Sequence, residues 1–218
     1  MNSTGSTGEP LLDQAWMYFH DGDYQRAIQL LRQAIHGGVN PGLAEYRLGF
    51  CFRAMGKHDD AIAHFRQAAR IDPDSAWACF QVGKELALQG RLENALSELA
   101  RAIELDLTHA DAYHDAGACL GSLGHFEEAL KCFTVCAFAC EVVVAQNIYT
   151  SVTPEMLRKA TNQLAGLMGQ EKFHQTRARV WQVFGMPAYP QTADHISHSG
   201  FETMRAELTQ VMRKYGSP

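Results

Sequence analysis

The sequence predicts an all-α superhelix, a solenoid built from helix pairs that stack side by side. Glycines recur at a constant spacing of 34 residues, and an alanine follows each glycine five residues later. These residues are Gly22, Gly56, Gly90 and Gly124, followed by Ala27, Ala61, Ala95 and Ala129. A strict period of this length is typical of helix–turn–helix repeats, which usually present a concave surface to another protein.

The period divides residues 8–143 into four repeats, and each glycine falls at repeat position 15. The repeats cover residues 8–41, 42–75, 76–109 and 110–143. Small residues recur at positions 8, 20 and 27 and let two helices approach closely, while large residues at positions 11 and 24 fill the seam. The glycine ends the first helix of each pair by accepting a left-handed backbone conformation. We therefore expect the helix pairs to break at the four glycines.

The small/large code resembles the tetratricopeptide repeat family, most clearly in the second repeat. The residues that carry the resemblance are Leu48, Gly49, Phe52, Gly56, Ala61, Phe65, Ala68 and Pro73. The other three repeats lack the proline at position 32, and none has the tryptophan that the family favours at position 4. The resemblance implies a superhelix of four helix pairs that binds peptides or proteins.

A narrower resemblance covers residues 13–105 and centres on "LGFCFRAMGKHDDAI" at Leu48–Ile62. This part is similar to the three-repeat chaperones that hold translocator subunits for type III secretion. Such a resemblance implies a small cytoplasmic chaperone that grips a hydrophobic segment in an aromatic groove. The chain departs from that pattern by its fourth repeat and its C-terminal extension.

The family resemblance also implies which side chains line the concave groove, because the first helix of each pair faces it. The implied peptide-binding residues are Trp16, Phe19, Tyr46, Phe50, Arg53, Trp77, Phe80 and Lys84. Six solvent-facing aromatic side chains favour a groove for apolar anchors of a partner segment, extended or helical. Arg53 and Lys84 are expected to meet carboxylates of that segment. As alternatives, the aromatic residues pack on the N-terminal lead, or the chain's own C-terminal segment fills the groove.

Composition and charge narrow the class of partner. The net charge is −5, and residues 1–143 carry 19 acidic against 11 basic side chains, which disfavours nucleic acid. No stretch of about 20 apolar residues exists, so no membrane span is expected. Residues 1–7 are interpreted as a flexible lead, and Met1–Pro10 lacks the features of a signal peptide. These features predict a cytoplasmic protein whose six cysteines are reduced.

Residues 144–218 do not continue the period and are predicted to form a helical capping region. One helix is expected to begin at Thr153-Pro154 and to end at Gly169, and a second to carry Phe173, Val180, Trp181 and Phe184. A capping box of Ser199 and Glu202 opens a third helix that runs to Tyr215.

The second helix of the fourth repeat is apolar on every side, since Glu141 is the only charged residue of residues 133–145. Such a helix has to be buried, and we expect the C-terminal region to cover it. A homodimer contact is the alternative. The corresponding second hypothesis for function is a structural scaffold that self-associates through the fourth repeat and the C-terminal helices.

Simple packing explains most of the residues that could carry chemistry. Cys132, Cys136 and Cys140 lie four residues apart on one helix, but small apolar residues are expected there and core packing explains them. His195 and His198 lie three residues apart without the framework of a metal site. No nucleophile elbow, phosphate-binding glycine loop or paired-carboxylate motif is present. We therefore predict no enzymatic activity, no catalytic residue, no metal and no cofactor.

Overall fold

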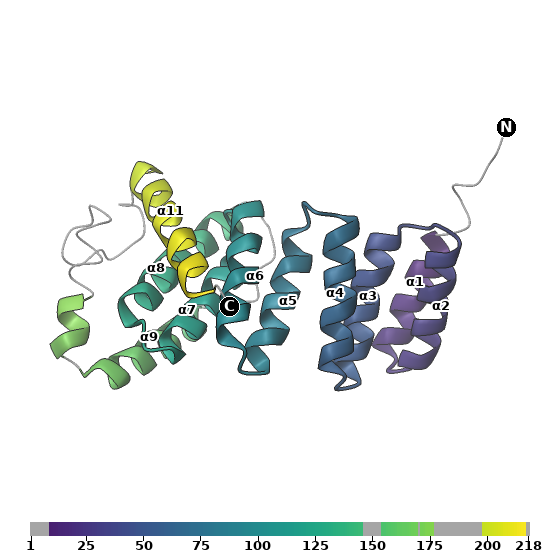
Figure 1. Ribbon diagram of the computed structural model, residues 1–218, viewed down its shortest axis with the longest axis horizontal. Coiled ribbons are helices and arrows are strands. Elements are labelled where there is room, and N and C mark those ends of the chain that lie inside the picture. The colour runs from purple at the N-terminus through teal and green to yellow at the C-terminus, as the bar shows by residue number, and fades with distance from the viewer. Residues whose placement is uncertain (1–8, 146–153, 170, 177–197, 217–218) are drawn as a thin grey trace. The chain divides into compact units, whose positions relative to one another are not determined.

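The computed structural model describes residues 9–145, 154–169, 171–176 and 198–216, and within them all regular structure is α-helical (Figure 1). The helices with defined bounds are α1 (Glu9–His20), α2 (Tyr24–His36), α3 (Pro41–Ala54), α4 (His58–Ile71), α5 (Ala76–Leu88), α6 (Leu92–Leu105), α7 (Ala110–Ser122), α8 (Phe126–Ala145), α9 (Pro154–Met168) and α11 (His198–Tyr215). The chain divides into two compact units, residues 1–85 and 86–218, and the division falls within α5. Each unit is therefore described by itself.

The helix pairs break where the glycine period predicts. Gly22, Gly56, Gly90 and Gly124 have φ angles of 81°, 72°, 75° and 85°, which place them in the left-handed region. An added Cβ would meet no atom within 4 Å at any of these four positions. Glycine is thus required by the backbone conformation and not by close packing.

Packing explains a second set of glycines, at repeat position 8. A Cβ on Gly49 would lie 2.5 Å from Cδ1 of Phe65, and one on Gly117 would lie 2.8 Å from Cε1 of Phe133. Both phenylalanines occupy repeat position 24 and are buried. The small residue on the first helix therefore makes room for the large ring on the second, in either unit.

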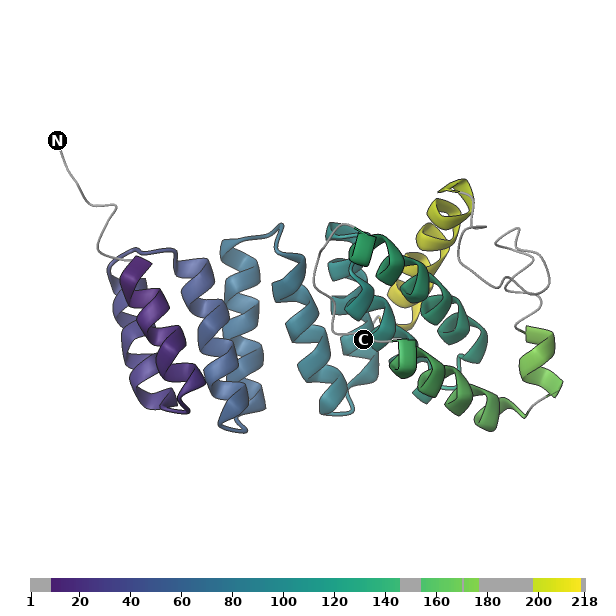
Figure 2. The same ribbon diagram turned by 180° about the vertical axis from the view of Figure 1, so that it is seen from behind.

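The C-terminal helices pack on the second unit from two sides. Helix α9 contacts α7 and α8, and α11 contacts α6 and α8 (Figure 2). On α11, Leu208 and Met212 are fully buried, and the Arg213 guanidinium lies 2.6 Å from the Glu104 carboxylate. The Tyr215 ring stacks on His125, with 3.7 Å between ring centroids. These helices therefore cover the last helix pair.

Two of the three helices expected after residue 144 are confirmed. Helix α9 ends before Gly169, whose φ of 80° is left-handed. Helix α11 begins at His198, one residue before the expected cap. Of the remaining helix only residues 171–176 are described, and Val180, Trp181 and Phe184 lie outside the described residues.

The apolar segment of α8 is buried as far as its side chains are described. Val135 and Cys136 are fully buried, and the Cys136 thiol donates a hydrogen bond to the Ala110 carbonyl (3.1 Å). The side chains of residues 138–145 lie outside the described part, so the burial of the "EVVVA" run stays a prediction. No helix in the described residues is both long and apolar enough to cross a membrane.

His109 caps the N-terminus of α7 and makes the stability of the folded protein depend on pH. Its Nδ1 accepts a hydrogen bond from the Ala112 amide (3.4 Å), and burial lowers the pKa of the imidazole below the ordinary value of 6.5, against the opposing effect of Asp106, Asp111 and Asp115. The unfolded chain therefore binds this proton more readily than the folded protein, and stability falls as the pH drops below about 6.5.

We expect His109→Asn to flatten this pH dependence, because asparagine can still cap the helix but does not titrate. The slopes of the free energy of unfolding against pH should differ between parent and variant by at most about 1.4 kcal/mol per pH unit. Denaturant unfolding of both proteins between pH 5.5 and 7.5 measures it. Equal slopes for parent and variant would show that His109 does not titrate differently on folding.

Candidate functional site

The residues implied as peptide-binding all belong to the first unit, on α1, α3 and α5. Helices α1 and α3 bring four of them into one group of rings, with Phe50 at its centre. The ring centroid of Phe50 lies 5.9 Å from that of Trp16, 6.4 Å from that of Phe19 and 5.0 Å from that of Tyr46. All three pairs are in edge-to-face geometry. Trp16 and Phe19 stack on each other at 4.6 Å. We call Trp16, Phe19, Tyr46 and Phe50 the aromatic cluster.

The aromatic cluster rests on a buried base. The fully buried ring of Phe65, from α4, lies 5.3 Å from Phe50 and 5.6 Å from Tyr46. Trp16, Phe19, Tyr46 and Phe50 themselves are only partly exposed. The cluster therefore combines structural packing with an aromatic surface open to solvent, and Phe50 belongs to both.

Two arginines flank the cluster and are engaged by groups of this chain. The Arg47 guanidinium lies 5.3 Å from the Trp16 ring and donates a hydrogen bond to the Leu12 carbonyl (2.5 Å). Arg53 lies over the Phe50 ring at 4.3 Å and donates to Oε1 of Gln81 (2.8 Å). Such cation–π contacts hold a guanidinium against an aromatic face.

The structure reveals a buried carboxylate that sequence reasoning missed. The Glu85 side chain is 0% exposed, and its Oε1 lies 3.4 Å from Nη1 of Arg53. Its other oxygen lies 2.8 Å from Nδ1 of His58, which is half exposed. This network connects α3, α4 and α5 within the first unit. Arg53 was expected to meet a ligand carboxylate, and the structure directs its guanidinium to Gln81 and Glu85.

A sequence signal for this network exists in the repeat alignment. Glu85 occupies repeat position 10, where the second and fourth repeats have the buried cysteines Cys51 and Cys119. A carboxylate at a position that is apolar elsewhere indicates a charged partner in the core, because an unpaired buried charge is costly. The sequence alone does not say which cation supplies the pairing.

Helix α5 carries the remaining candidates at positions i, i+3 and i+7. Trp77 is 42% exposed, and its ring lies 6.0 Å from that of Phe80, edge to face. Phe80 is only 3% exposed, which corrects the expectation that it faces solvent. The Lys84 ammonium lies 5.5 Å from the Phe80 ring. Phe80 thus packs beneath the two side chains beside it.

A pocket of about 700 Å³ adjoins Trp77 in the first unit. Its apolar lining comes from Pro41, Leu43, Tyr46, Ile71 and Trp77, and we call it the anchor pocket. Ile71 and Trp77 are exposed large hydrophobic residues, and burial raises the pKa of the Tyr46 hydroxyl. An opening of this size and lining can receive a large apolar side chain.

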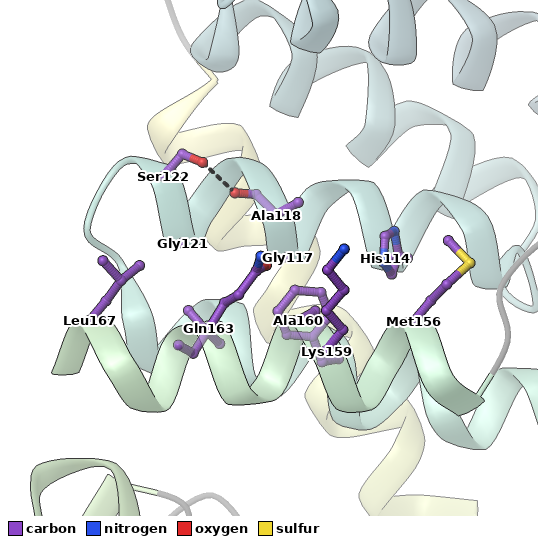
Figure 3. Close-up of a pocket in the computed structure, with 12 residues that line it drawn as sticks. His114, Gly117, Ala118, Gly121, Ser122, Met156, Lys159, Ala160, Gln163 and Leu167 are labelled. Carbon is purple, nitrogen blue, oxygen red and sulfur yellow. Dashed lines mark hydrogen bonds between the residues drawn. The ribbon is translucent and has the colours of Figure 1, made fainter. Parts of the chain in front are cut away.

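In the second unit, the chain's own helix α9 covers the equivalent face. A pocket of about 370 Å³ lies between α7 and α9 (Figure 3). From α7 it is lined by His114, Ala118, Gly121 and Ser122, and the first three occupy the repeat positions of Tyr46, Phe50 and Arg53 in the second repeat. A Cβ on Gly121 would lie 3.0 Å from Cδ2 of Leu164 on α9. Helix α9 therefore covers this face of the fourth repeat, while self-filling of the groove in the first three repeats stays an alternative.

The described cysteines behave as core residues. Burial raises the pKa of the Cys51 thiol to about 11 and that of Cys119 to about 12, and it raises the pKa of Cys132 as well. The raised pKa values reflect the burial of these thiols in the apolar core. Among the described residues, no group of three or more His, Cys, Asp or Glu side chains could hold a metal ion. The side chains of Cys140, His195 and His198 lie outside the described residues.

Fold and site together define a helical-repeat protein with a partly exposed aromatic surface. Tetratricopeptide repeat models match residues 11–36 and 43–75. Residues 11–36 and 43–75 are thus tetratricopeptide repeats, which supports a protein–protein interaction module. A search of curated proteins gave no match.

Solved structures of tetratricopeptide repeat proteins share the fold. PilF of Pseudomonas aeruginosa is similar at 17% identity and a TM-score of 0.61, over 99% of this chain and 89% of PilF. A thermophilic repeat protein of Thermus thermophilus is similar at 18% identity and a TM-score of 0.54, over 94% of this chain and 100% of that protein. YrrB, described as having an unusual peptide-binding site, has 18% identity and a TM-score of 0.54, over 81% of this chain and 94% of YrrB.

Proposed function

We propose that the first unit binds a segment of a partner protein through its aromatic cluster and anchor pocket. The observation that carries the proposal is the exposure of Trp77 beside the 700 Å³ anchor pocket, whose lining is mostly apolar but includes Asp72, next to the partly exposed aromatic cluster. An exposed tryptophan at the mouth of an apolar pocket is a typical binding hot spot. The segment supplies apolar anchors, and the protein acts as a chaperone or adaptor.

Binding is favoured over the alternative of a self-associating scaffold. That alternative places the contact with a second copy on the apolar fourth repeat together with the C-terminal helices. Helices α9 and α11 already contact α8, and Phe133, Val135 and Cys136 are buried within the chain. The first unit, in contrast, presents aromatic side chains that remain accessible.

A more specific form of the proposal is a cytoplasmic chaperone for secretion translocator subunits. It is supported by the resemblance of Leu48–Ile62 to the three-repeat chaperones and by the aromatic surface to which that segment contributes Phe50. Co-expression with a hydrophobic translocator segment would test it, since a chaperone of this kind keeps the segment soluble.

The general proposal predicts that Trp77→Ala weakens binding at least tenfold, a loss of about 1.4 kcal/mol. Peptides selected on the full chain from a displayed library of random 12-residue sequences serve as ligands, and calorimetric titration measures their affinity. Because Trp77 is 42% exposed, the melting temperature of the variant should change little.

Met17→Ala is the matched control, because Met17 is a 68% exposed apolar residue of the same unit outside the implied groove positions. Its affinity should equal that of the parent. If Trp77→Ala binds the selected peptides as tightly as Met17→Ala does, the anchor pocket is not the binding site. Failure to select any peptide would contradict the proposed function as a whole.

A further inference from the structure

We infer that the partner segment is acidic as well as apolar, with a carboxylate that pairs with Lys84 while an apolar side chain fills the anchor pocket. This inference rests on the proposed function and specifies the chemistry of the ligand. It departs from the expectation that Arg53 and Lys84 share the task, because the structure assigns the two cations different environments.

Arg53 and Lys84 differ in whether a carboxylate of this chain already pairs with their charge. The Arg53 guanidinium contacts the buried Glu85 carboxylate at 3.4 Å, and Arg47 lies 3.8 Å from the Asp13 carboxylate. The Lys84 ammonium contacts the face of Phe80, and no ion pair of Lys84 is found among the described residues. Lys84 is therefore the groove cation whose charge is available to a carboxylate from outside.

The position of Lys84 on α5 sets the spacing of the two recognition elements. Trp77 and Lys84 are seven residues apart, so they lie on one face of the helix, about 10 Å apart along its axis at ~1.5 Å per residue. An extended partner segment covers that length in about three residues at ~3.3 Å each. A helical partner segment covers it in about seven residues.

Charge favours such a ligand as well. Phe80 is buried beneath Lys84, so the ammonium is held at an aromatic surface of lowered polarity, where an ion pair is stronger than in water. The net charge of −5 acts only weakly on this pairing, because charges beyond about 8 Å are largely screened at physiological salt. Asp72 lines the anchor pocket and favours an uncharged side chain there.

The test compares selections from the random 12-residue library on the parent, on Lys84→Glu and on Arg32→Glu. Arg32 is an exposed residue of α2, and its variant carries the same sign of charge change outside the implied groove positions. We expect peptides selected on the parent and on Arg32→Glu to pair a large apolar residue with Asp or Glu three or seven positions away. On Lys84→Glu the acidic preference should be lost and Lys or Arg should replace it.

One selected peptide then gives a quantitative check. Replacing its acidic residue by the matching amide should weaken binding to the parent at least fivefold and leave binding to Lys84→Met unchanged, because that variant offers the peptide neither an attractive nor a repulsive charge, as a double-mutant cycle requires. Apolar peptides with no acidic preference, or an acidic preference that survives in Lys84→Glu, would overturn the inference and leave the proposed function intact. If no peptide is selected on any of the three proteins, both fail.

Discussion

Arg53→Met is expected to lower the free energy of unfolding by about 3 kcal/mol, because it leaves the Glu85 carboxylate buried without its guanidinium partner. Glu85 is 0% exposed, so water cannot replace the lost contact at 3.4 Å. Methionine keeps the length and apolar stem of arginine, so the loss reflects charge and hydrogen bonding more than volume. Gln81 loses its 2.8 Å donor, and Phe50 loses the cation above its ring.

Denaturant unfolding of the variant measures the effect, and Arg32→Met serves as the matched control. Arg32 is exposed on α2, so its replacement should change the free energy of unfolding by no more than about 0.5 kcal/mol. The double variant Arg53→Met with Glu85→Leu should recover most of the loss, since removing both charges also removes the burial penalty. Equal stabilities of Arg53→Met and Arg32→Met would show that His58 alone satisfies Glu85.

Gly49→Ala is expected to lower the free energy of unfolding by about 1–3 kcal/mol, the usual cost of overpacking a core. The added methyl carbon would lie 2.5 Å from Cδ1 of Phe65, whose ring is fully buried. Displacing that ring also disturbs Tyr46 and Phe50, whose ring centroids lie 5.6 Å and 5.3 Å from that of Phe65. Peptide affinity should therefore fall together with stability.

Gly166→Ala is the control for the general effect of replacing a helical glycine. Gly166 lies within α9, and a Cβ there would meet no atom within 4 Å. Its replacement should leave the protein unchanged or stabilise it by up to about 1 kcal/mol. Adding Phe65→Leu to Gly49→Ala should restore part of the lost stability. If Gly49→Ala melts like the parent, the position 8 glycine is not required for packing.

The structure also revises what is expected of Phe50. From its repeat position, a loss of affinity with little change in stability is predicted for Phe50→Ala. The ring in fact contacts Trp16, Tyr46 and the buried Phe65, and Arg53 covers its face. We now expect both affinity and stability to fall. Trp77, at 42% exposure, remains the residue whose replacement separates the two effects.

The sequence by itself determined the fold and the helix boundaries, because local rules govern them. A left-handed residue is needed wherever a helix pair turns, and Gly22, Gly56, Gly90 and Gly124 supply it at one spacing. The small/large code at positions 8 and 24 likewise follows from the fixed distance between paired helices, as Gly49 and Phe65 show. The same regularity placed Trp16, Tyr46 and Phe50 on neighbouring helices.

Only the tertiary structure decided how those side chains are used. Whether Phe80 is exposed, and whether Arg53 faces a ligand or Glu85, depends on contacts between residues about 30 positions apart that no local pattern encodes. Helix α9, which packs against α7, belongs to a segment outside the repeats. Its sequence predicts a helix but does not predict where that helix packs. A repeat period fixes the geometry of each helix pair, whereas burial and charge pairing depend on which surfaces meet in the folded chain.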